Sequence, residues 1–509
     1  MPSTLSDTLV STLDRWFDNT EVVTPSVNFA LFDRDGVVYH RGVGEFQRDG
    51  RAPGLDTIYR IASMSKSFEM AIVLVLEERG LLALDDRVSE HVTEFSDPVD
   101  AFGSVMPVTI RMLMSNSSGL PEDNGWADHE LGLSRDDFLT VIAAGLTFAD
   151  RPGAGFQYSN IGFWLLGVIV ENVTGLDYES FARQTILEPL GLTSTRFSIG
   201  DYSEAEAAEV AHGFGTFDEG ATWFDRPFVG TGIGGCAASM FSTVTDIARW
   251  SAWLSSAFDP RNTDDAILSR ASRRLMQRIH TSAPSPAERP AEQQLEGIGY
   301  GLGLFIENDV RFGLIAQHSG GLPGWSSNMR WHLESGLGVV VFANTNGVRP
   351  GIQATAMLRA LLESRNVPAR SIAVLPTTLA AAEALEAAIV TYGDVSGAQT
   401  HLSADLRSTN LLSGNLLSDV PAEVRSARLQ KALVEIGGLT VSRAPITARL
   451  AWAISGAQLT WTIPGVNGEL ECRLEMTPTV PALVQRLDVE VRVPVTELSS
   501  VTRRYRPVV

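Results

Sequence analysis

The sequence contains only two cysteines, Cys236 and Cys472, among its 509 residues. They lie far apart in the chain, so we expect no disulfide framework. No group of Cys and His residues has the spacing of a zinc site. We therefore predict a protein that works without a metal ion or another cofactor.

Long apolar runs and an excess of positive charge are also missing. Acidic residues outnumber basic ones by 60 to 40, a net charge of −20, which repels phosphate backbones and anionic membranes. We expect neither nucleic acid nor membrane as a partner. The N-terminus has no basic region followed by an apolar core, and no apolar run reaches spanning length. These features predict a cytoplasmic protein.

The length predicts two or three domains, and the hydrophobic content of 44% is sufficient for a large core. An amphipathic helix is expected over 7–20, followed by a hairpin around Asp35-Gly36 and an apolar helix from Ser63 to about 79. Helices and loops continue to about 290, with an exposed Pro-rich loop over 281–297. Strands are then expected at 300–306, leading into 315, at 329–333 and at 338–343, before a helix over 352–362. Strands at both ends of a segment with helices between them predict one α+β domain over 1–365, with an antiparallel sheet completed by distant parts of the chain.

The last part of the chain has a different pattern. An Ala-rich run at 378–391 resembles a helix, while the rest of 372–445 shows no clear pattern. Beyond 450, apolar and polar residues alternate with period two, as in half-buried antiparallel strands. We predict a separate small antiparallel β-barrel or sandwich over 371–509, with two smaller units as an alternative.

The first chemical motif is Ser63-Met64-Ser65-Lys66 at the head of the apolar helix. A serine and a lysine three residues apart lie on one helix face, so the ammonium can reach the hydroxyl. The helix start also presents free backbone N–H groups to anything bound near Ser63. A nucleophilic serine needs both a partner for its proton and donors for an oxyanion. Alone, the motif fits an ordinary solvated helical turn equally well.

Two further motifs follow in the chain, Tyr158-Ser159-Asn160 at a helix start and His318-Ser319-Gly320-Gly321 after a strand. Each has a structural explanation: an aromatic residue at a helix start, an N-cap, or a turn. Together and in this order, with the Ser-x-x-Lys motif, they resemble the penicillin-recognising serine hydrolases. Tyr-x-Asn points to the class C β-lactamase branch. The similarity covers residues 25–365, including Ser117-Ser118-Gly119-Leu120-Pro121.

The resemblance implies a β-lactamase/transpeptidase-like fold and a role for each motif residue. Ser63 would be the nucleophile of an acyl-enzyme, and Lys66 and Tyr158 would share the handling of its proton. Asn160 would hold Lys66 and bind the substrate, and the N–H groups of Ser63 and Gly321 would form the oxyanion hole. His318, in the motif with Gly320, would stand beside the substrate where β-lactamases more often carry a lysine. A neutral histidine cannot anchor a carboxylate permanently, which disfavours β-lactam substrates.

Asp123 follows the Ser-Ser-Gly-Leu-Pro phrase, where it could receive a substrate ammonium or be an ordinary acidic loop residue. The layout is similar to that of a D-aminopeptidase of this superfamily, in which antiparallel lipocalin-like β-barrels follow the catalytic domain. This similarity implies a homodimer and a small-molecule or short-peptide substrate. We therefore predict a D-aminopeptidase or D-amino-acid amidase. The alternatives are a carboxylesterase of the same fold and a non-catalytic penicillin-binding-like scaffold.

Overall fold

A computed structural model describes residues 5–19, 23–284, 295–346, 348–395, 419–441, 443–492 and 506–508. The chain divides into two compact units, Met1–Val367 and Pro368–Val509. Each unit has its own hydrophobic core, so each is considered by itself.

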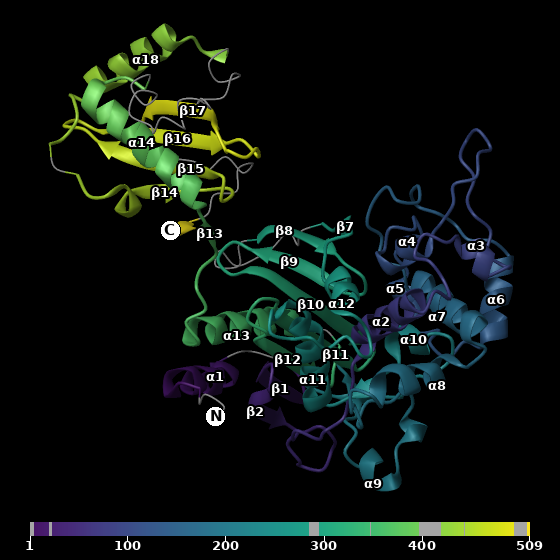
Figure 1. Cartoon of the computed structure of the whole chain (residues 1–509). Helices are drawn as coiled ribbons and strands as arrows, with labels where there is room; N and C mark the ends of the chain where they lie inside the picture. The colour runs from purple at the N-terminus through teal and green to yellow at the C-terminus, as the bar shows by residue number, and fades with distance from the viewer. Residues whose placement is uncertain are drawn as a thin grey trace. The chain divides into compact units, whose positions relative to one another are not determined.

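An eight-stranded antiparallel sheet forms the centre of the first unit (Figure 1). Its order is β2-β1-β12-β11-β10-β9-β8-β7. The strands are β1 Ser26–Asp33, β2 Gly36–Gly44, β7 Thr281–Ser282, β8 Leu295–Tyr300, β9 Phe305–Asp309, β10 Gly313–Leu322, β11 Trp325–His332 and β12 Gly338–Ala343. The pairing of Val27 with Ala343 joins β1 to β12, so distant parts of the chain complete the sheet as predicted.

Alternate side chains of the central strands enter two different cores, because successive strand residues point to opposite faces of a sheet. Phe29 and Val341 pack with α1 (Asp7–Asn19) and α13 (Pro350–Ser364) on one face. Ala30 and Phe342 pack on the other face, where α2 (Ser65–Glu78) and α11 (Val244–Ser255) lie. The predicted hairpin, lead helix and closing helix are thereby confirmed.

A helical region lies beside the second face of the sheet (Figure 1). Its longest helix is α7, Asn160–Thr174, which Ser159 caps by accepting the Gly162 N–H and which ends at Gly175 in the left-handed conformation. Helix α2 is buried from Ser65 to Leu76, so even its polar residues are enclosed. The shorter helices are α3 Val88–His91, α4 Ile110–Met114, α5 Asn124–Ala127, α6 Arg135–Ala143, α8 Tyr178–Ala182, α9 Glu204–Ala207, α10 Gly235–Ala238 and α12 Arg270–Met276.

Two short two-stranded pairs complete the regular structure of this unit. They are β3 Tyr59–Arg60 with β6 Phe241–Ser242, and β4 Gly213–Gly215 with β5 Phe224–Arg226. The β3–β6 pair is antiparallel and directly precedes the turn that contains Ser63. The pair therefore fixes the position of the backbone that leads into the Ser63 turn.

The prediction of one strand over 300–306 is wrong. The chain turns at Gly301–Leu304, between β8 and β9. Gly303 has φ +69, and a Cβ there would lie 2.6 Å from Met70 Cγ and 2.8 Å from the Lys66 carbonyl oxygen. The turn therefore presses against α2, and glycine is needed both for its conformation and for its size. The predicted loop over 281–297 begins in β7 and ends in β8, while 285–294 lie outside the described residues.

The second unit contains a four-stranded antiparallel sheet in the order β14-β15-β16-β17. Its strands are Leu450–Trp452, Gln458–Pro464, Glu469–Met476 and Val484–Val491. In β16, buried residues alternate with half-buried ones, which confirms the period-two prediction. The strands β13 Ser371–Ala373 and β18 Arg506–Val508 pair in parallel.

Two helices of the second unit pack against this sheet, α14 (Pro376–Tyr392) and α18 (Ala422–Glu435). The first was predicted from its Ala-rich run, whereas the second lies where the sequence showed no clear pattern. A separate small antiparallel sheet domain is confirmed. Closure into a barrel and a division into two smaller units stay predictions, since 396–418 and 493–505 lie outside the described residues.

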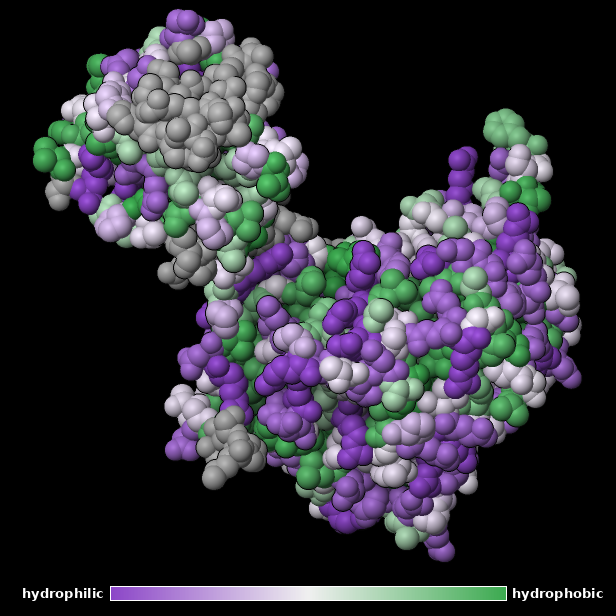
Figure 2. Space-filling view, in the orientation of Figure 1, coloured by the Kyte–Doolittle hydropathy of each residue, from purple (hydrophilic) through white to green (hydrophobic). Residues whose placement is uncertain are grey.

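The visible face of the first unit carries mostly hydrophilic residues, with hydrophobic ones scattered between them (Figure 2). Among the described helices, none combines the length and apolar character needed to cross a membrane.

Candidate active site

Ser63 lies in a tight turn of 3-10 helix, Ala62–Met64, directly before α2. Ala62 has φ +50, a conformation that non-glycine residues rarely adopt. Such strain persists only where the surrounding structure enforces it, and it is common at functional sites. The turn leaves Ser63 half-buried while its neighbours Ala62 and Met64 are fully buried.

Lys66 is completely buried and turns its ammonium toward Ser63. Its Nζ donates to Ser63 Oγ at 3.1 Å, to Asn160 Oδ1 at 2.7 Å and to the Ala237 carbonyl oxygen at 3.4 Å. The rings of Tyr158 and Phe163 each lie with their centroids 5.1 Å from Nζ. The structure therefore brings Ser63, Lys66, Tyr158 and Asn160 together, as the motifs predicted. The Ala237 carbonyl, from the short helix α10, was not predicted.

Asp123 is tied to the start of α7. One carboxylate oxygen accepts the Asn160 N–H at 2.7 Å and the Asn160 Nδ2 at 2.9 Å, and the other accepts the Ile161 N–H at 2.9 Å and the Ser159 hydroxyl at 3.1 Å. A carboxylate at a helix N-terminus satisfies free N–H groups and interacts favourably with the helix dipole. Asp123 therefore fixes Asn160, and through it Lys66. A substrate ammonium at Asp123, as the sequence predicted, would have to compete with these four donors of the protein for the carboxylate oxygens.

A second acidic residue, Asp128, closes α5 five residues later and was not singled out from the sequence. Its carboxyl is half-buried, and burial raises its pKa to about 6, with Asp123 adding to the rise and Lys66 and His129 opposing it. The loop after it is fixed to the chain that leads into α10, since the Gly232 N–H donates to the Leu131 carbonyl at 2.9 Å. The loop after Asp128 and the chain before α10 are therefore held together, and Lys66 is near enough to act on the Asp128 carboxyl. No sequence pattern distinguishes it from a surface aspartate.

Strand β10 passes beside the Ser63 turn at Gly320. A Cβ there would lie 2.2 Å from the Ile61 carbonyl oxygen and 2.3 Å from Ser327 Oγ, so only glycine fits. Ser327 Oγ donates to the same Ile61 carbonyl at 2.8 Å, which ties β11 to the turn as well. Next to it, a Cβ on Gly321 would meet nothing within 4 Å. Since β9 pairs with β10 only as far as Gln317, the backbone around Gly321 can serve a bound molecule.

His318 is 2% exposed, and neither of its nitrogens is open to a substrate. Nδ1 lies 2.5 Å from the Ser319 carbonyl oxygen and Nε2 lies 3.1 Å from the Tyr300 hydroxyl. Burial lowers the pKa of His318 to about 3, and Lys66 lowers it further. The residue is therefore neutral, and its ring nitrogens are used within the protein.

Glu69 lies on α2 close to Lys66 and is fully buried. Burial raises its pKa well above the usual range, although Lys66 and Cys236 act in the opposite direction. Burial therefore favours the uncharged form of Glu69. The hydrogen bonds of Lys66 go instead to the oxygens of Asn160, Ser63 and Ala237.

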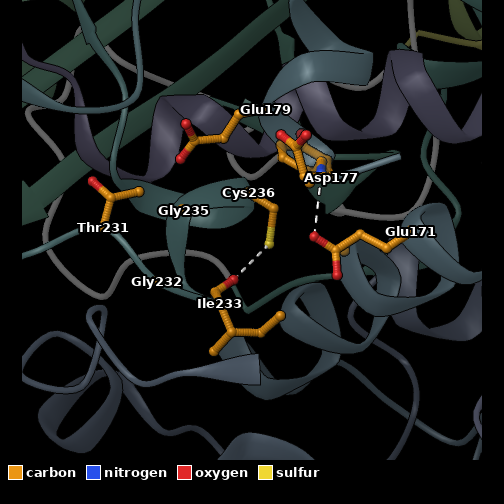
Figure 3. Close-up of a pocket in the computed structure, with 10 residues that line it drawn as sticks. Glu171, Asp177, Glu179, Thr231, Gly232, Ile233, Gly235 and Cys236 are labelled. Carbon is orange, nitrogen blue, oxygen red and sulfur yellow. Dashed lines mark hydrogen bonds between the residues drawn. The ribbon is translucent and has the colours of Figure 1, made fainter. Parts of the chain in front are cut away.

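A cavity of about 170 Å³ lies on the other side of Cys236 and Gly235 (Figure 3). None of the predicted site residues lines it. Cys236 Sγ donates to the Ile233 carbonyl at 3.2 Å, and Glu171 pairs with Arg135 at 3.0 Å. The Glu171 carboxylate at this cavity is thus used within the protein. Across the described residues, no three His, Cys, Asp or Glu side chains are arranged to hold a metal ion.

An antiparallel sheet with helices on both faces, and a Ser-x-x-Lys helix start beside a glycine-containing strand, define the β-lactamase/transpeptidase-like class of fold. The chain belongs to the beta-lactamase family, because the family model described as Beta-lactamase matches residues 13–363, more than half of its length.

Individual relatives agree with this assignment. Penicillin-binding protein 4* of Bacillus subtilis (strain 168) is 28% identical over 323 residues, 60% of this chain and 65% of the relative. The chain therefore spans slightly less than two thirds of that protein's length. The octameric penicillin-binding protein homologue from Pyrococcus abyssi has a TM-score of 0.57 at 20% identity, covering 95% of this chain and 99% of that one. A beta-lactamase/D-alanine carboxypeptidase from Yersinia pestis has a TM-score of 0.55 at 19% identity, covering 71% and 100%. At these identities the two structures support the fold alone.

Proposed function

We propose that this protein is a serine hydrolase that forms an acyl-enzyme at Ser63. The observation that carries the proposal is the 3.1 Å contact between Lys66 Nζ and Ser63 Oγ, inside a site where Lys66 is fully buried. A serine hydroxyl becomes a useful nucleophile when an adjacent group can take its proton. The family membership and the strained turn at Ala62 support the same conclusion.

In the proposed reaction, Ser63 Oγ attacks the substrate carbonyl carbon while Lys66, which first gives one of its own protons to water, accepts the hydroxyl proton. The carbonyl oxygen becomes an oxyanion, which the N–H groups of Ser63 and Gly321 would stabilise. The C–N or C–O bond then breaks, the leaving group takes a proton, and water hydrolyses the ester on Ser63. Each step uses groups of this chain and water.

Tyr158 would complete the route for the proton. Its ring lies over Lys66 Nζ at 5.1 Å, so the two groups can exchange a proton through a bound substrate or water. The direct contact favours Lys66 as the first acceptor and leaves Tyr158 to protonate the leaving group. Asn160 would hold Lys66 in place, since its Oδ1 accepts from Nζ while Asp123 and Asn124 fix its amide.

We further propose a substrate with a free amino group, namely a small D-configured amide or short peptide. Because Asp123 is occupied by α7, the half-buried Asp128 carboxylate is better suited to receive an ammonium. The neutral His318 offers no positive charge to a substrate carboxylate, which disfavours β-lactams and C-terminal carboxylates. A carboxylesterase would use the same Ser63 and Lys66 on a weaker bond, and a scaffold would keep the site without turnover.

A panel of three substrates tests the proposal: D-alanine amide, L-alanine amide and p-nitrophenyl butyrate, each with the protein and with its Ser63→Ala variant. We expect Ser63-dependent hydrolysis with D-alanine amide as the best amide. Fast ester hydrolysis with inert amides would replace the amidase with the carboxylesterase. Absence of any Ser63-dependent turnover would favour the scaffold.

The proposal also includes the remaining sequence predictions: a hydrolase domain over 1–365, a separate domain over 371–509, a homodimer and a cytoplasmic location. Light scattering on the purified chain measures the assembly, and a monomer would contradict the homodimer. Ser63, Lys66, Tyr158 and Asn160 all belong to the first unit, which supports placing the chemistry there.

A further inference from the structure

Two segments that carry proposed site residues are connected through Tyr300, which no motif singled out, and through His318. The first is the loop before α7, with Tyr158, and the second is the part of β10 that passes the Ser63 turn. We propose that Asn116, which fixes the Tyr158 loop, and the hydrogen-bonded pair Tyr300 and His318, against which the Tyr158 ring packs, form an uncharged link that holds this loop at a fixed distance from β10. They would be positioning residues, and the inference rests on the proposed function of Tyr158 and Ser63.

The link begins at Asn116, which holds the chain on both sides of Tyr158. Its carbonyl oxygen accepts the Gln157 N–H at 2.9 Å, and its Oδ1 accepts the Ser159 N–H at 3.1 Å. Asn116 has φ +54, a left-handed conformation in which asparagine is among the few favoured residues. Since Asn116 is 1% exposed, the Tyr158 loop is fixed from inside the protein rather than from its surface.

Tyr300 continues the link at the end of β8. It is completely buried, and burial raises its pKa well above the usual range, with Tyr158 and Glu69 acting in the same direction. The phenol is therefore neutral and keeps its proton. Its ring meets the Tyr158 ring edge-on, with centroids 6.3 Å apart. Tyr300 thus contacts the residue that the loop presents, while Asn116 fixes the same loop through its backbone.

His318 ends the link, and its hydrogen bonds define its tautomer. The Ser319 carbonyl oxygen can only accept, so the hydrogen must lie on Nδ1, 2.5 Å away. Nε2 then has a free lone pair and accepts the Tyr300 hydroxyl at 3.1 Å. Lys66 is the charged group near this histidine, the rings around it are Tyr158, Tyr300 and Phe305, and its pKa is lowered to about 3. A proton on Nε2 would break the bond from Tyr300 and place a second positive charge near Lys66.

Because none of the three residues of this link gains or loses a proton between pH 5 and pH 8, its geometry stays the same over that range. It would keep the Tyr158 ring at one distance from Lys66 and from the backbone donors of β10. Precise placement of this kind is worth large factors in rate, since small misplacements of catalytic groups slow a reaction strongly.

The first experiment measures the histidine directly. Selective ¹⁵N-histidine labelling of the full chain, with His318→Gln to assign the signal, reports protonation and tautomer without any substrate. We expect the neutral Nδ1–H form with no titration between pH 5 and pH 8. Titration in that range, or an Nε2–H tautomer, would overturn the inference. This result stands even if the protein hydrolyses nothing, so failure of the link and failure of the proposed function are distinguishable.

The second experiment uses turnover. Tyr300→Phe removes only the hydroxyl, and we expect kcat to fall about tenfold while KM stays within twofold. The matched control is Tyr202→Phe, which removes another buried hydroxyl, one that donates to the Ser194 carbonyl at 2.7 Å away from the described site. We expect it to lower the melting temperature by a similar amount and to leave kcat unchanged.

Asn116→Gly completes the test, because glycine tolerates the left-handed conformation while the side-chain bonds are lost. If the three residues act as one link, the double variant with Tyr300→Phe should lose less kcat than the product of the two single losses. Unchanged kcat in Tyr300→Phe, or independent losses in the double variant, would show that these residues serve stability alone.

Discussion

The two sides of the candidate site differ in how they use charge. The helical side, made by α2, α7 and the two ends of α5, carries Lys66, Asp123 and Asp128 around the neutral Asn160. The strand side next to the site, made by Tyr300 at the end of β8 and by His318–Gly321 in β10, carries neutral side chains and backbone groups, with His318 and Tyr300 turned inward. Under the proposed function, the helical side would carry proton transfer and ammonium binding. The strand side would supply the Gly321 oxyanion donor and a fixed geometry.

The largest effect should come from removing the central charge of the helical side. Lys66→Met takes away the only group that contacts Ser63 Oγ among the described side chains, and we expect kcat/KM to fall about 10³-fold, within the range for loss of a general base. The chain has only one other lysine, Lys431 in the second unit, so Lys431→Met is a matched control and should keep full activity. Steady-state kinetics on the best substrate of the panel measures both. A fall of less than tenfold in Lys66→Met would move the role of first base to Tyr158.

Next in size is a change on the strand side that adds no charge. Gly320→Ala places a Cβ against the Ile61 carbonyl and must push β10 away from the Ser63 turn. We expect a loss of about 10²-fold in kcat, similar to the loss of an oxyanion donor. Gly297→Ala in β8 is the control, because a Cβ there meets nothing within 4 Å. Normal kcat in Gly320→Ala would contradict the assignment of the oxyanion donors to this strand.

A third test concerns the neutral state of the strand side. His318 has a folded pKa of about 3 against an ordinary value of 6.5, so the unfolded state binds a proton between these values and the folded state does not. Its contribution to stability is present above pH 6.5 and is lost as the pH falls toward 3. We expect about 2 kcal/mol of this loss between pH 7 and pH 5. His318→Gln should make the dependence shallower by that amount in urea unfolding at the two pH values, whereas an unchanged slope would mean that His318 is charged in the folded protein.

The smallest expected effect separates the two aspartates of the helical side. Asp128→Asn should lower kcat/KM for D-alanine amide about tenfold relative to p-nitrophenyl butyrate, because only the amide carries an ammonium. In the unmodified protein the same ratio should fall below about pH 6, where the Asp128 carboxyl gains a proton and loses its charge. Asp136→Asn, on the exposed side of α6, controls for net charge. Equal losses on both substrates would show that Asp128 acts in folding and not in selectivity.

The parts of the fold with local signals could be predicted from the sequence. Asp35-Gly36 marked the hairpin, the alternation in β16 marked a half-buried strand, and the apolar helix after Ser63 proved to be the buried α2. The break between β8 and β9 could not be predicted, since it depends on the closeness of Gly303 to Met70 in α2. Helix α18 was missed because its first half is polar, although Leu429, Ala432 and Leu433 recur at helical spacing and pack in the core of the second unit.

The residues of the candidate site also fall into those that could be predicted from the sequence and those that could not. Ser63, Lys66, Tyr158 and Asn160 belong to motifs whose chemistry is visible in the sequence, and the structure brings them together. The roles of Asp123 and His318 depend on which donors and acceptors reach them, and these come from residues 36 to 38 positions away for Asp123 and from Tyr300, 18 positions away, for His318. Asp128, Asn116 and Tyr300 have no motif. Their positions follow from burial and from hydrogen bonds that exist only after folding.

The central claim is that Ser63 is the nucleophile, and a covalent label tests it most directly. The intact protein is incubated with a fluorophosphonate, weighed, and digested to locate the label. The account predicts one added group per chain on Ser63, none in Ser63→Ala, and none on Ser65, whose hydroxyl donates to the Ala62 carbonyl at 2.7 Å. A protein that stays unlabelled, or a label on a different residue, would contradict it.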